Sequence, residues 1–100
     1  MNTTNSDGDL VLTRKPTQVP RPAIVEHHIR AALELEYNAV YVETALRTMT
    51  VDSCDENHLI IHAESDFECT LIHERVLPVA EALIAELYGI RPVISVVRAY

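Results

Sequence analysis

Five residues that can bind a metal ion or act as nucleophiles recur through the second half of the chain. They are Cys54, His58, His62, Cys69 and His73, at intervals of four, four, seven and four residues. Thiolate and imidazole groups are the usual zinc ligands. However, no Cys-x-x-Cys pair anchors the set, and His58 and His62 fall in a segment patterned as a strand. We therefore expect no metal and no cofactor, and a small metal-binding domain remains only an alternative.

Cys69, His73 and Glu74 supply a nucleophile, a base and an orienting acid on neighbouring helical positions. Nothing around them indicates a cleft or an oxyanion site, which acyl-transfer chemistry needs. The chain has two glycines, Gly8 and Gly89, so the Gly-x-x-x-x-Gly-Lys-Ser/Thr phosphate loop is absent. We therefore expect that the chain is not an enzyme.

The segment that carries these residues is predicted to form a strand, a helix and a second strand. In residues 58–63, Leu59, Ile61 and Ala63 alternate with the other three, which is the period of a strand. Residues 93–97 are rich in β-branched side chains and suit a buried strand. Gly89 stands where a helix ends in a left-handed residue.

A long amphipathic helix is predicted from Ser65 to Tyr88. The Ser65 hydroxyl and the Glu68 carboxylate fit a capping box, in which each accepts from the other residue's amide. Pro78 removes the hydrogen bond to the Glu74 carbonyl, so we expect a kink or a restart there. The apolar face of this helix is predicted to comprise Phe67, Leu71, Ile72, Val76, Val79, Ala80, Leu83 and Leu87.

The first half of the chain predicts two helices and the first strand of a hairpin. Pro22 suits the first turn of a helix, Glu26 and Arg30 form an i,i+4 pair on it, and Asn38 can cap a second helix. A strand over residues 47–51 and a turn over residues 52–57 follow. The apolar faces of the two helices are Val25, Ile29, Ala32 and Leu33, then Tyr41, Val42, Ala45, Leu46 and Met49.

Composition limits the class of protein. The chain has 100 residues, of which 48% are apolar, and a net charge of −7, so we expect one small globular domain. No run of eighteen apolar residues could span a membrane, and the N-terminus lacks the apolar core of a signal peptide. Two cysteines do not make a disulfide framework. These features predict a cytoplasmic protein with free thiols.

Residues 1–21 are predicted to form a flexible polar tail before a domain of residues 22–100. Arg14, Lys15 and Arg21 make part of this tail basic, and a basic arm can contact nucleic-acid phosphates. The overall charge of −7 argues against nucleic acid as the main partner. A nucleic-acid accessory protein is thus an alternative, and a protein partner is the main expectation.

The predicted order, helix–helix–strand–strand–helix–strand, resembles domain I of the bacterial replication initiator DnaA over residues 22–98. The resemblance is based on four features: the strand sequence Leu59-Ile-Ile-His-Ala63, the segment Ser65-Asp66-Phe67, the long helix, and the segment Gly89-Ile-Arg-Pro-Val-Ile-Ser-Val96. The C-terminal domain of the clamp-loader subunit tau has a similar layout. The chain lacks the tryptophans usual in the initiator family, and it lacks the Gly-x-x-Gly loop of nucleic-acid-binding KH domains.

The resemblance implies a KH-like α/β domain, from a bacterium or a phage, that is either an excised domain or a free-standing relative. It implies a protein-interaction module in DNA replication initiation or its regulation, which docks a replicative helicase, an initiator, a regulator or a second copy. Carried over, the partner-binding residues are Tyr37, Tyr41, Glu43 and Phe67. Phe67 is either an exposed contact residue or a staple on the sheet, and the tyrosines are either contact residues or half-buried side chains with solvated hydroxyls.

Overall fold

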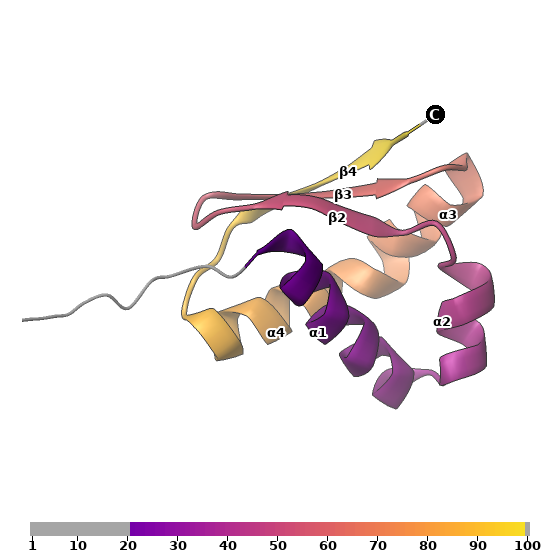
Figure 1. Ribbon diagram of the computed structural model, residues 1–100, viewed down its shortest axis with the longest axis horizontal. Coiled ribbons are helices and arrows are strands. Elements are labelled where there is room, and N and C mark those ends of the chain that lie inside the picture. Colours follow the sequence, from indigo (N-terminus) through magenta and orange to yellow (C-terminus); the bar gives the residue numbers. More distant parts are fainter. Residues whose placement is uncertain (1–20, 100) are drawn as a thin grey trace, which may run out of the picture.

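The computed structural model describes residues 21–99 and has two layers. A three-stranded sheet forms one layer, and all the helices cover one face of it (Figure 1). Along the chain the order is helix–helix–strand–strand–helix–strand. The predicted α/β class and order are therefore confirmed.

The first two helices are α1 (Pro22–Glu36) and α2 (Ala39–Ala45). Pro22 lies in the first turn of α1, as predicted. The Asn38 side chain accepts from the Tyr41 amide over 2.7 Å and separates the two helices. The predicted core residues of these helices are buried, apart from half-buried Ala32, Ala45 and Tyr41.

The sheet consists of β2 (Thr50–Cys54), β3 (His58–Ala63) and β4 (Val93–Arg98). β3 is central, antiparallel to β2 and parallel to β4. The predicted alternation in β3 is confirmed, because Leu59, Ile61 and Ala63 are buried against the helices.

The first strand and the turn lie later in the chain than predicted. A bulge at Asp52 lets β2 continue to Cys54. The turn therefore comprises residues 55–57 and is shorter than the predicted turn over residues 52–57. Asp55 Oδ1 accepts from the amides of Asn57 and His58, each over 2.8 Å. The turn therefore forms through side-chain bonds to its own backbone, the chemistry that the sequence indicated.

The long helix is continuous but changes its hydrogen-bonding pattern. It comprises α3 (Asp66–Leu71), the π-helical segment η2 (Ile72–Val76) and α4 (Leu77–Tyr88). Pro78 occupies the first turn of α4, where its missing amide costs little. The α-helical pattern therefore restarts next to Pro78, one of the two predicted outcomes, although the helical path is unbroken. Gly89 ends the helix at φ 68°, the left-handed conformation that was expected.

Two parts of the predicted core are wrong. The buried stripe of the long helix is Glu68, Ile72, Val76, Ala80 and Ile84, at intervals of four, and it leaves Phe67 and Leu87 exposed. β4 is an edge strand and not a buried one. No described helix covers its outer face, so Val93 and Val97 are exposed. Within residues 21–99, no helix combines the length and the apolarity that crossing a membrane requires.

Candidate protein-docking surface

Phe67 borders an open groove between the end of α2 and the start of α3. Its side chain is 71% exposed, so it is not the staple on the sheet that was one of the two expectations. The groove has a volume of about 380 Å³ and lies between α2 and the β3–α3 junction. Its lining comprises Thr44, Ala45, Arg47, Thr48, Glu64, Ser65, Phe67 and Glu68. Aromatic side chains are enriched in protein interfaces, so an exposed phenylalanine beside a groove favours a protein-contact site.

The outward face of α2 leads into this groove. Val40, Glu43, Thr44 and Arg47 are three or four residues apart and all exposed, so they share one face. Val40 is 69% exposed. We call these four residues together with Phe67 the α2–α3 surface. Glu43 and Phe67 are among the partner-binding residues that the resemblance implied, whereas the other three were not predicted, although their spacing on a short helix is visible in the sequence.

Tyr37 and Tyr41 do not belong to this surface. Their ring centroids lie 5.0 Å apart, so the predicted shared face exists. However, both tyrosines are half-buried, and the Tyr41 hydroxyl is buried without a hydrogen-bond partner. The Arg75 guanidinium lies 6.0 Å from the centroid of the Tyr41 ring. Both rings therefore pack against the core, with Arg75 of η2 over Tyr41, and the expected solvated hydroxyl is not found at Tyr41.

Thr48 and Glu68 fix the floor of the groove. The Glu68 carboxylate accepts from the Thr48 amide over 2.8 Å and from the Thr48 hydroxyl over 2.6 Å. The same hydroxyl accepts from the Glu64 amide over 3.0 Å. One buried carboxylate thus ties the end of α2, the β3–α3 junction and α3 together.

One of the two hydrogen bonds of the predicted capping box is confirmed, and the other is wrong. The Ser65 hydroxyl accepts from the Glu68 amide over 3.1 Å, as expected. The Glu68 side chain does not return to Ser65, because it occupies the buried stripe of the helix and bonds Thr48. Burial requires such a carboxylate to be hydrogen-bonded, and Thr48 satisfies both of its oxygens.

A second polar pair holds the segment between α2 and β2. Glu26 and Arg30 form the predicted pair, with 3.3 Å between Arg30 Nε and Glu26 Oε2. Each also reaches across the fold. Glu26 Oε1 accepts from the Val51 amide over 2.9 Å, and Arg30 Nη2 donates to the carbonyls of Leu46 and Met49. The pair therefore positions the chain that leads from the groove into the sheet.

Most of the charged groups around the groove are acidic. Glu43, Glu64 and Asp66 are exposed near it, and Asp66 forms an ion pair of 3.2 Å with Arg98 of β4. Arg47 is the basic residue of the lining. Since the described residues carry the whole net charge of −7, a partner with a basic contact surface is favoured electrostatically.

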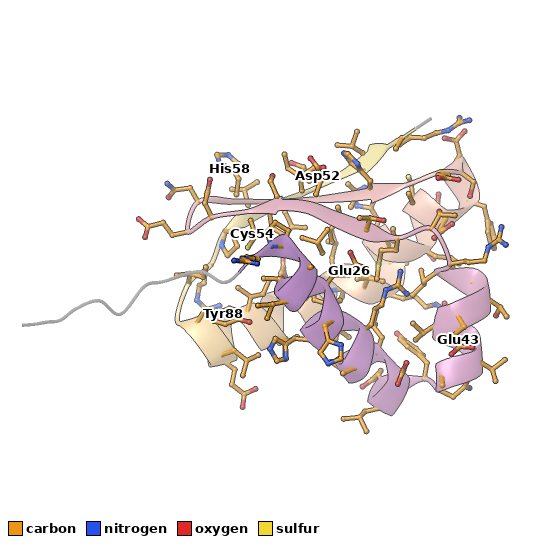
Figure 2. All side chains as sticks on the ribbon, viewed as in Figure 1. Glu26, Glu43, Asp52, Cys54, His58 and Tyr88 are labelled. Carbon is orange, nitrogen blue, oxygen red and sulfur yellow. The ribbon has the colours of Figure 1, made fainter. Side chains whose placement is uncertain are left out.

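The histidines and cysteines do not come together. His58 and His62 lie on the outer face of β3, where His62 Nε2 is 3.9 Å from Asp52 Oδ2, and Figure 2 shows His58 and Asp52 projecting away from the helices. Cys54 lies on the opposite side of the sheet, towards α1 and Tyr88. Among residues 21–99, no group of three or more His, Cys, Asp or Glu side chains could hold a metal ion.

The Cys54 thiol lies in a site that keeps it protonated. Burial raises the pKa of Cys54, and the nearby Asp55 carboxylate raises it further. Burial also raises the pKa of Tyr88, with a smaller contribution from Cys54. In contrast, bonds from the backbone amides of Asn57 and His58 lower the pKa of Asp55. A raised thiol pKa is the opposite of what a nucleophile needs.

The basic arm of the alternative hypothesis lies mostly outside the described residues. Arg14 and Lys15 are not described, whereas Arg21 is exposed directly before α1. Arg21 therefore contributes one cation at the start of the domain. The described residues therefore do not test the hypothesis that the basic arm binds nucleic acid.

Comparisons with known proteins add no relative to these observations. No family model matches the chain, and neither does any curated protein or solved structure.

Proposed function

We propose that the chain is a protein-interaction module that docks a partner on the α2–α3 surface. The observation that carries this proposal is the 71% exposure of Phe67 beside a groove of about 380 Å³. The Thr48–Glu68 bonds fix the backbone next to Phe67, and such pre-organisation lowers the entropy cost of association. The acidic residues around it favour a basic partner.

The biological setting that we propose is DNA replication initiation or its regulation, in the cytoplasm of a bacterium or of a phage host. Its support is the resemblance of residues 22–98 to domain I of the replication initiator, together with the order of helices and strands. The proposed partners are a replicative helicase, a full-length initiator or a regulator. The module needs no cofactor and performs no chemistry in this role.

Binding of the purified full chain to purified bacterial replicative helicase and to full-length initiator tests this setting. We expect concentration-dependent, saturable binding to at least one of them, and the binding should weaken as salt is raised, because charge steers the encounter. Absence of binding to both proteins, at concentrations where the chain is folded, would contradict the replication role.

A further inference from the structure

The two edges of the sheet differ in how they are protected. The β2 edge is closed, because Glu26 accepts from the outward-pointing Val51 amide and the bulge at Asp52 interrupts the strand. Natural proteins use such bulges, charges and covers to prevent pairing between sheet edges. β4 carries none of these devices between Val93 and Val97, and no described strand pairs with its outer edge.

The backbone groups that point to this edge can be assigned. The Val93 amide donates to the Asn57 carbonyl and the Ala99 amide to the Ala63 carbonyl, each over 2.8 Å. Because the peptide groups of a strand point alternately to its two sides, the odd-numbered amides of β4 bond β3. Those of Ile94 and Val96 therefore point outward.

We propose that two copies of this chain pair through their β4 strands and form one continuous six-stranded sheet. A two-fold axis beside Ser95 places Ile94 of one copy opposite Val96 of the other, so that both exchange N–H···O bonds. Val93 then lies beside Val97 of the second copy on the outer face, where both side chains are exposed in the single chain.

Charge favours a second copy at this place. The protein has a net charge of −7, so two copies repel each other in most orientations. Residues 87–99 contain no Asp or Glu, so two copies meet here without opposed carboxylates. A single strand pair makes a small interface, and the dimer should therefore be weak and concentration-dependent.

Sedimentation equilibrium of the full chain, from low micromolar to near-millimolar concentration, tests the pairing. We expect a reversible monomer–dimer equilibrium in the wild type. The double variant Val93→Lys/Val97→Lys should weaken it by roughly tenfold or more, because like charges then lie opposite each other. The matched control Ile24→Lys/Leu35→Lys adds the same charge at two exposed positions on α1 and should leave the equilibrium unchanged.

Cross-linking tests the register. In a background of Cys54→Ala/Cys69→Ala, Ser95→Cys places two thiols at a non-hydrogen-bonded pair with Cα atoms about 4.5 Å apart, within reach of a disulfide. Oxidation should give a covalent dimer, whereas Leu35→Cys, at an exposed position on α1, should give little in the same background. A wild type that stays monomeric would overturn the proposal. The proposal would also be overturned if the control lysines abolished the dimer. It would fail as well if the Ile94 and Val96 amides resisted hydrogen exchange in the monomer, because the outer edge of β4 would then already be paired.

Discussion

The Thr48 hydroxyl donates to the Glu68 carboxylate over 2.6 Å, and this contact joins three segments that are distant in the sequence. Glu68 is the one charged residue among the buried residues of the described chain. It stands in the stripe that Ile72, Val76 and Ala80 continue, where an apolar residue would be expected. The groove beside Phe67 therefore owes its shape to a buried polar contact.

Replacing Glu68 with alanine should destabilise the fold. The variant leaves the Thr48 amide and hydroxyl without their acceptor, and hydrogen bonds to a charged group are worth about 1.5–3 kcal/mol each in mutational series. The loss of both bonds is partly offset, because the variant also removes the cost of burying the carboxylate. We therefore expect a net loss of about 2–3 kcal/mol in the free energy of unfolding, measured with urea. The control Glu81→Ala changes an exposed glutamate in α4 and should cost less than about 0.5 kcal/mol. Equal stability of the two variants would show that the Thr48 contact contributes nothing.

Truncation should destabilise the protein to different extents at two positions near the end of α4. Ile84 is fully buried, whereas Leu87 is 48% exposed. Ile84→Ala should cost about 2–5 kcal/mol, because it leaves a cavity in the core. Leu87→Ala should cost about 1 kcal/mol or less. If thermal unfolding ranked the two variants the other way, the stripe through Ile84 would be misplaced.

Stability should fall at alkaline pH. The folded-state pKa values of Cys54 and Tyr88 lie above their ordinary values of 9.0 and 10.0, so the folded state binds these protons more tightly than the unfolded state. Their contribution is fully present below the unfolded-state pKa values and is lost as the pH rises through the folded-state values. Urea unfolding at neutral pH and just above 10.0 measures the decline.

Cys54→Ala is the diagnostic variant for this alkaline decline. It removes one of the two protons and should make the decline shallower, whereas Cys69→Ala provides the matched control at the other half-buried cysteine. A decline of the same size in Cys54→Ala and in the wild type would mean that the thiol takes no part.

The order of helices and strands could be predicted from the sequence because local signals agree with the fold. Asn38 and Gly89 mark the helix ends through their own backbone preferences. The alternation in β3 reports one buried face. These signals act within a few residues, so a single sequence carries them.

Features that depend on contacts distant in the sequence could not be predicted. The strand β4 has the composition of a buried strand, yet its exposure follows from its place at the sheet edge. The π-helical turns of η2 shift the helix register, so Ile84 is buried and Leu87 is not. The Glu68–Thr48 contact spans 20 residues, and only the interruption of an apolar stripe hinted at it.

The candidate surface shows the same division. Phe67 and Glu43 could be carried over from a resemblance, and both are exposed. Tyr41 lies on the same helix as Glu43, but its hydroxyl is buried and Arg75 of η2 lies over its ring. The spacing of Val40, Thr44 and Arg47 is visible in the sequence, but their position beside Phe67 depends on contacts between distant segments.

The most direct test is the affinity of the helicase or the initiator for Phe67→Ala compared with Leu87→Ala. Both variants truncate an exposed apolar side chain, one on the α2–α3 surface and one in the last turn of α4, at the other end of the molecule (Figure 1). Phe67→Ala should weaken binding by roughly tenfold or more, as removal of a central aromatic contact does, while Leu87→Ala should bind like the wild type. Equal affinity of the two variants, or a loss confined to Leu87→Ala, would contradict docking at the α2–α3 surface.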